Sequence, residues 1–175
     1  MSNIKLQNVR LSFPSLFQTA EFAGDDTGKY EATFILDKDK HNDVIEQINS
    51  EMERMQKEDL KSKLKSDKLA LKNGDDMARP EFEGKMTIKA STKKRPLVID
   101  RDKTPLTQDD NKPYAGSYVN AIVRLWAQDN QYGKRVNASL EGVQFFGDGE
   151  PFGAGGISVN EFDDFEDADD PFGIR

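Results

Sequence analysis

The chain of 175 residues contains no cysteine, which excludes disulfides, thiol chemistry and cysteine-based zinc sites. Its 35% hydrophobic and 33% charged residues, without an apolar run long enough to span a membrane, are typical of one intracellular domain with no membrane partner. The 25 basic and 32 acidic side chains give a net charge of −7, which at first argues against nucleic acid as a partner.

Two strands are predicted in the first 36 residues. Apolar residues alternate across Ile4–Phe13, and their register changes near Asn8, which is typical of a strand with a β-bulge. Residues 14–28 are rich in glycine, proline and aspartate and predict a long loop. Lys29–Leu36 alternates without interruption, which predicts a second strand.

A helical segment then interrupts the strands. Asp43 and Glu46 have the spacing of a capping box, and apolar residues recur at helical spacing at Ile45, Ile48, Met52 and Met55. We expect a helical insertion over about residues 41–72. The only histidine, His41, has no second ligand or nucleophile motif near it, so we interpret it as a surface residue rather than a catalyst.

The second half of the chain is again β. Strands are predicted at Lys85–Ser91, Pro96–Asp100, Ser117–Gln128 and Lys134–Phe146, with a turn at 129–133 joining the last two. The fold class is therefore mostly β: an OB-fold-like small antiparallel β-barrel over residues 1–150, with one interposed helical segment. Residues 151–175 are predicted to be a glycine-rich linker and a disordered acidic tail.

One face of the strand 117–128 has the chemistry of a nucleic-acid contact. Tyr118 and Trp126 share this face with Arg124, while the opposite face is apolar. Aromatic rings stack on bases and cations neutralise phosphates, so we predict that Tyr118 and Trp126 stack on single-stranded nucleic acid, with Tyr114 as a weaker third. The alternative is that other elements cover this face and Trp126 is ordinary packing.

A basic segment supports the same interpretation. Residues 85–103 contain seven basic and two acidic side chains, a local charge of +5. Together with Arg124, the predicted phosphate contacts are Lys85, Lys89, Lys93, Lys94 and Arg95. The alternative is a solvated edge strand that lysines protect from aggregation.

The negative charge is concentrated in residues 161–175, which hold seven carboxylates and one arginine. Phe162, Phe165 and Phe172 interrupt these carboxylates, so the segment is a polyanion with hydrophobic anchors. Such a tail can occupy the cationic groove of its own protein and, once displaced by DNA, dock on other proteins. The alternative is a solubilising end.

Other classes of function have weaker support. Asp100 and Asp102 could belong to a metal-dependent nuclease, but no motif accompanies them. The glycine-rich run 147–156 lacks the Lys-Ser/Thr of a phosphate-binding loop, and the tail carboxylates do not have the spacing of a calcium loop. We expect no enzyme activity, cofactor or metal. A second hypothesis is an acidic protein-interaction or DNA-mimic module that does not itself bind DNA.

Four stretches are similar to those of a known family: VRLSFPSLF (9–17), KYEATFIL (29–36), GSYVNAIVRLWA (116–127) and GVQFF-GDGEPFG (142–153). With these stretches the chain resembles the tailed-phage single-stranded-DNA-binding proteins of the OB-fold type. The resemblance implies an OB-fold that covers single-stranded DNA during phage replication or recombination in the cytoplasm of the infected bacterial host. It also implies an acidic tail that engages replication proteins; a monomer or weak homodimer is expected.

The tail end also resembles a known motif. Asp169, Asp170, Pro171 and Phe172 are similar to the acidic Pro-Phe end of bacterial single-stranded-DNA-binding proteins. The resemblance implies that these residues, with Phe162 and Phe165, bind partners. The chain differs from the bacterial motif because Gly173–Arg175 follow the phenylalanine.

Overall fold

The computed structural model describes residues 3–152. The predictions for the tail, including those for Phe162, Phe165 and Asp169–Phe172, lie outside the described residues. Within the described part, no helix is both long and apolar enough to cross a membrane.

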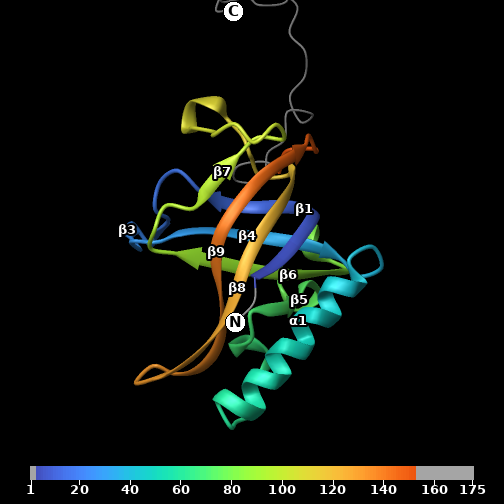
Figure 1. The fold of residues 1–175 in the computed structure, drawn as a ribbon, viewed down its shortest axis with the longest axis vertical. Coiled ribbons are helices and arrows are strands. Elements are labelled where there is room, and N and C mark those ends of the chain that lie inside the picture. The colour runs from blue at the N-terminus through green and yellow to red at the C-terminus, as the bar shows by residue number, and fades with distance from the viewer. Residues whose placement is uncertain (1–2, 153–175) are drawn as a thin grey trace, which may run out of the picture.

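Five strands form a closed barrel (Figure 1). They are β1 (Asn3–Ser15), β4 (Tyr30–Asp37), β6 (Lys85–Thr92), β8 (Tyr118–Asn130) and β9 (Gly133–Gly147). The antiparallel order β6-β4-β1-β8-β9 closes through a parallel pairing of β6 with β9 at Ser91 and Ser139. This is the strand order of the OB-fold, so the predicted fold class is confirmed.

Short elements extend the barrel at its loops and edges. They are the hairpin β2 (Glu21–Phe22) and β3 (Asp25–Asp26), β5 (Leu71–Asn73) on β6, and β7 (Leu97–Ile99) on β9. The β8–β9 hairpin pairs through Asn130 and Gly133, so its turn is tighter than the predicted five residues. Its end projects below the barrel in Figure 1, and we call this end, residues 128–135, the arm.

The predicted bulge in β1 is confirmed. The register of β1 on β8 shifts between Leu6 and Val9, and Asn8 there has a φ of 53°. The Asn8 N–H, which the bulge frees from the ladder, donates to Asn120 Oδ1 at 2.9 Å. A side chain therefore satisfies the backbone group that the irregular strand leaves without a partner.

His41 ties this bulge to the start of the helix. Its Nδ1 accepts from the Asp37 N–H at 2.9 Å, so Nε2 carries the proton. Nε2 lies 3.0 Å from Gln7 O and 3.1 Å from Asn8 O and donates to these carbonyls. The predicted non-catalytic residue is thus half-buried and bridges two elements.

The helical segment is shorter than predicted. Helix α1 (Asn42–Arg54) continues into a wider turn over Met55–Asp59, and the chain then runs without regular structure, apart from a 3-10 turn at Ser66–Lys68, to β5 (Figure 1). The predicted capping box is absent: the residue before the helix, His41, makes no side-chain cap bond.

Helix α1 begins at Asn42, so Asp43 lies within its first turn and cannot be the N-cap residue of a capping box. The Asp37 carboxylate accepts from the N–H groups of Asp39 and Lys40 at 2.9 and 3.0 Å and pairs with Lys85. The Lys40 N–H, then the Lys85 side chain, hold the pKa of Asp37 far below its ordinary value. Asp37 therefore organises the turn that precedes α1.

The core fills the barrel and extends under α1. Phe34, Leu125 and Leu140 are almost completely buried inside the barrel. The apolar face of α1 adds Ile48 and Met52 to the same cluster. Truncating one of these barrel residues to alanine would lower the free energy of unfolding by about 2–5 kcal/mol. This packing holds in place the strands that carry the surface residues described below.

Candidate nucleic-acid interface

A groove crosses the outer face of β4 and β6 between β5 and the lower part of β9. It has a volume of about 200 Å³, and its floor contains Thr33, Thr87 and Ser91. Three cations line it, Lys72 from β5, Lys89 from β6 and Arg135 from β9. We call it the basic groove.

The cations of the basic groove lie close enough to influence one another. Burial, followed by the charge of Arg135, lowers the pKa of Lys72. Lys89 also pairs with Glu31 at 3.0 Å, and Arg135 Nη2 donates to the backbone carbonyl of Asp67 at 3.1 Å. A bound anion would therefore reduce the repulsion among these cations. The contacts with Glu31 and Asp67 already hold Lys89 and Arg135 in position.

Two exposed aromatic residues lie on the loops associated with this face. Phe22, on the β2–β3 hairpin between β1 and β4, is 79% exposed, and Tyr132, at the turn of the arm, is 80% exposed. In OB-folds, the loops joining the first to the second strand and the fourth to the fifth flank the oligonucleotide-binding face. Neither residue was predicted from the sequence to be a contact, although each is an aromatic side chain within a predicted polar loop or turn.

Trp126 adjoins the basic groove. Its side chain lies on the outer face of β8 and is 39% exposed. Its register partner on β9 is Asn137, which lines the groove. Arg124, on the same face, is 3.7 Å from Glu141 and donates from Nε to Asn3 Oδ1 at 3.1 Å. The predicted face therefore borders the groove at Trp126, while the charge of Arg124 is already paired.

Tyr118 lies at the other end of that face. Trp126 is eight positions further along the strand, which corresponds to a distance of roughly 26 Å at about 3.3 Å per residue. The Arg10 guanidinium lies 5.8 Å from the Tyr118 ring centroid and 4.2 Å from that of Phe152. The structure therefore does not bring the two predicted stacking residues together.

Residues 148–152 pack across this end of the barrel, and we call them the strap. Arg10 donates to Gly116 O at 3.0 Å and to Glu150 O at 2.6 Å. The Phe152 N–H donates to Ala115 O at 3.0 Å. Gly116 has a φ of +104°, and a Cβ there would collide with Glu150 O. The described start of the predicted glycine-rich run, residues 148–152, is therefore docked on the barrel through Phe152.

Tyr114 fastens the strap. Its hydroxyl donates to Asp148 Oδ1 at 2.9 Å, and it also accepts from the Gly149 N–H at 3.1 Å. Burial, more than the Asp148 charge, raises the pKa of Tyr114. Its ring is a partly buried neighbour of the core, so the residue predicted as a third stacking contact is engaged by the strap.

The other predicted phosphate contacts divide into two groups. Lys85 pairs with Asp37 at 2.9 Å, as Lys89 does with Glu31. Lys93, Lys94 and Arg95 are exposed in the turn after β6, and none of them pairs with a carboxylate of residues 3–152. Arg95 Nη2 donates to Phe17 O at 3.1 Å, which places this turn beside the loop that carries Phe22.

The carboxylates considered for a nuclease are engaged in their own loop. Asp100 pairs with Lys112 at 3.0 Å, and Asp102 accepts from the Thr104 N–H and hydroxyl at 3.1 and 2.6 Å. Lys112 and Thr104, respectively, lower the pKa values of these carboxyl groups. Among the described residues, no group of three or more His, Asp or Glu side chains is arranged to hold a metal ion.

Comparisons with known proteins agree with one another. The family model described as Enterobacter phage Enc34, ssDNA-binding protein, matches residues 2–172. Protein p50 of Acyrthosiphon pisum secondary endosymbiont phage 1 is 42% identical over 95% of this chain and 96% of its own. The single-stranded DNA-binding protein from bacteriophage Enc34, solved in complex with ssDNA, is 34% identical, with a TM-score of 0.78 over 86% of this chain and 89% of its own.

A more distant solved structure shares the fold alone. The single-stranded DNA binding protein gp2.5 of bacteriophage T7 has a TM-score of 0.52 over 84% of this chain and 92% of its own, at 13% identity.

Proposed function

The chain belongs to the family of the Enterobacter phage Enc34 ssDNA-binding protein, and from this premise we propose that it binds single-stranded DNA with little sequence preference, without cleaving it. The observation that carries the proposal is the basic groove, because it lies on the face of the barrel that OB-folds use for oligonucleotides. The relative from phage Enc34 that was solved in complex with ssDNA supports it.

In this proposal the phosphates lie along the basic groove. Lys72, Lys89 and Arg135 neutralise them, and the bases stack on Phe22, Tyr132 and Trp126. Every base has an aromatic face, so stacking tolerates any sequence, and the cations track a backbone that is the same in every sequence.

The remaining predicted contacts take different parts in this arrangement. Lys93, Lys94 and Arg95 would meet the strand where it passes the Phe22 loop. Lys85 and Arg124, like Lys89 in the basic groove, would have to exchange a carboxylate for a phosphate. Because the strap binds the Tyr114 hydroxyl and Arg10 lies over the Tyr118 ring, we propose that Tyr114 and Tyr118 fix the strap rather than stack on bases.

The proposed biological role is to cover single-stranded DNA during phage replication or recombination in the cytoplasm of the infected host. The tail, with seven carboxylates against one arginine in residues 161–175, has the charge to compete for the basic groove. When DNA displaces it, Phe162, Phe165 and the Asp169–Phe172 motif become available to replication or recombination proteins.

Titration with oligo-dT is expected to quench the fluorescence of Trp126, the only tryptophan. The affinity should fall with salt at a log–log slope of about −0.7 per phosphate neutralised, and a duplex of equal length should bind more weakly. Trp126→Ala should weaken binding about five- to a hundred-fold, measured by anisotropy of a labelled oligonucleotide. An unchanged affinity contradicts the stacking role of Trp126; failure to bind any oligonucleotide favours the protein-interaction module instead.

Truncation after Val159 is expected to strengthen oligo-dT binding several-fold at low salt, because it removes the polyanion that competes for the groove. The gain should shrink as salt rises, since screening weakens the competing tail. Anisotropy titrations of both proteins at two salt concentrations measure this difference. Equal affinities at low salt would leave partner docking as the only proposed role of the tail.

A further inference from the structure

The connection between the helix and β5 carries a second basic surface that the sequence analysis did not single out. Resting on the proposed function, we propose that Lys61, Lys63 and Lys65 bind the phosphates of the DNA strand where it leaves the basic groove and passes beneath the arm. We call these three residues the lysine strip. They extend the DNA path beyond the barrel.

The lysine strip has a defined conformation. From Leu60 to Lys65, alternate residues face inward and outward: Leu60 is buried, Ser62 and Leu64 are half-buried, and the three lysines are exposed. The backbone turns at Lys61, whose φ is 50°, and is extended at Lys65, so the three lysine side chains project from one short exposed segment.

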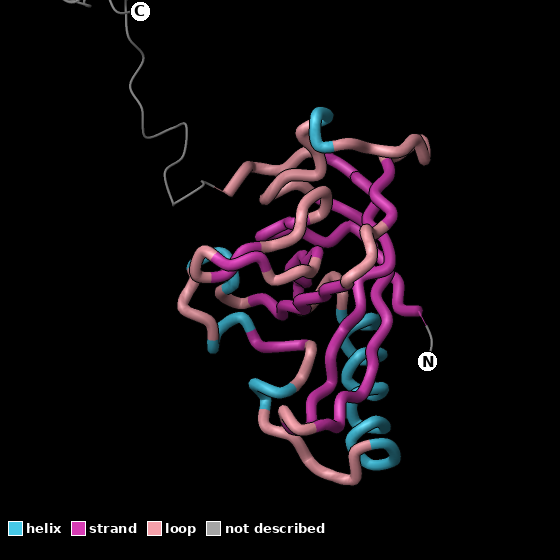
Figure 2. Tube along the Cα trace, turned by 90° about the vertical axis from the view of Figure 1, so that its left-hand side faces the viewer, coloured by secondary structure: helices cyan, strands magenta, loops and turns pink. Residues whose placement is uncertain are grey.

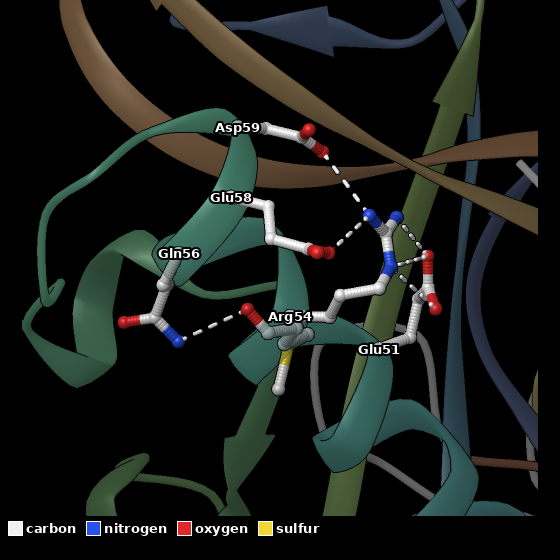
Figure 3. A network of polar contacts seen from close by, with 6 residues as sticks. Glu51, Arg54, Gln56, Glu58 and Asp59 are labelled. Atoms are coloured by element: carbon white, nitrogen blue, oxygen red, sulfur yellow. Dashed lines mark hydrogen bonds and ion pairs between the residues drawn. The ribbon is translucent and has the colours of Figure 1, made fainter.

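Hydrogen bonds from the end of the helix hold this segment in place. The N–H groups of Leu60 and Ser62 donate to the carbonyls of Met55 and Gln56 at 2.8 and 3.0 Å. The Leu64 N–H donates to Gln56 Oε1 at 2.7 Å. Gln56 Nε2 in turn donates to Met52 O at 3.2 Å, the dashed line drawn from Gln56 in Figure 3. The backbone beneath the lysines is therefore fixed before any ligand arrives.

The carboxylates at the end of the helix pair with cations of the helix itself: Glu53, which lines the same surface hollow as Lys61 and Lys63, pairs with Lys57 at 3.0 Å. Arg54 pairs with Glu51 at 2.6 Å, Glu58 at 3.1 Å and Asp59 at 3.8 Å, as Figure 3 shows. Hydrogen bonds to Glu51 and Glu58 raise the pKa of Arg54 above its ordinary value. None of the three lysines pairs with a carboxylate of the described chain, so their charges are available to a ligand.

The lysine strip is joined to the basic groove through two consecutive residues of β9. Lys134 Nζ donates to Leu60 O at 2.8 Å and to Ser62 Oγ at 3.2 Å. Its neighbour Arg135 lines the groove and donates to Asp67 O. In Figure 2 the segment passes below the end of the hairpin, from α1 on one side to the 3-10 turn and β5 on the other. A strand that follows the groove past Arg135 therefore arrives at the lysines.

The test compares two oligo-dT lengths, about 8 and about 24 nucleotides, because one OB-fold covers about 4–16. The variant carries Lys61→Gln, Lys63→Gln and Lys65→Gln. A control with Lys38→Gln, Lys40→Gln and Lys103→Gln has the same net charge, with exposed lysines removed elsewhere. Thermal unfolding of both variants should match that of the unmodified chain, since every substituted side chain is on the surface.

The expected result is a loss of affinity of roughly ten-fold for the longer oligonucleotide alone, with a salt slope shallower by about 2. An equal loss in the control variant, or an equal loss for both lengths, would overturn the proposal. If the unmodified chain binds neither oligonucleotide, the proposed function itself fails, and this outcome is distinct from the other two.

Discussion

Exchange of Lys72 and Arg135 for glutamate is expected to lower the affinity for oligo-dT by roughly a thousand-fold, because it removes two charge-assisted contacts and adds repulsion. Both cations line the basic groove, and they come from opposite walls of it. The log–log salt slope should become shallower by at least about 1.4, the share of two phosphates on a single strand. Anisotropy titrations at several salt concentrations measure both quantities.

The matched control reverses two cations outside the groove. Lys38→Glu with Lys40→Glu gives the same change in net charge, in the turn before α1. The control should lose little affinity, since a long-range effect of net charge is screened within about 10 Å at 0.1 M salt. If both double variants lose affinity equally, net charge decides binding and the basic groove is not the site.

The double substitution Phe22→Ala with Tyr132→Ala is expected to weaken binding by roughly thirty-fold or more, since each base stacked on an aromatic ring contributes about 1–3 kcal/mol. The salt slope should not change, because neither side chain neutralises a phosphate. This combination of a lower affinity and a constant slope separates stacking from charge, and the same titrations record it.

Phe146→Ala is the control for the aromatic residues. Phe146 is also an exposed ring, but Arg101 lies 5.1 Å from its centroid, and it stands at the end of β9 away from the arm. Its removal should leave DNA affinity unchanged. A loss in this control equal to that of the double variant would show that exposed rings matter irrespective of their place.

Local patterns in the sequence sufficed to predict most of the barrel. Alternation identified the long strands, and the change of register at Asn8 identified the bulge. The helix was predicted too long because Leu60 and Leu64 are four residues apart, the spacing of one helical turn, whereas the chain leaves the helix at Lys61, where φ is 50°. Lys134 holds the chain beyond this point through Leu60 O and Ser62 Oγ, and no local pattern contains those contacts.

The candidate site could be predicted only in part. Strand parity placed Trp126 on the outer face of its strand, where the structure has it. Lys72 and Arg135 are 63 positions apart, and only closure of the barrel brings them to one groove. Strand parity likewise could not show that the guanidinium of Arg10, 108 positions away, lies over the ring of Tyr118.

The position of β1 has a consequence for synthesis of the chain. The first strand lies between β4 and β8, and its residue Asn3 pairs with Arg124. While the ribosome makes the chain from its N-terminus, one edge of β1 therefore stays open until more than 120 residues have emerged. Contacts so distant in sequence form slowly, and an open edge invites pairing with other chains. The nascent protein thus depends on rapid completion of the β8–β9 hairpin, and a message truncated before this hairpin would yield an aggregating fragment.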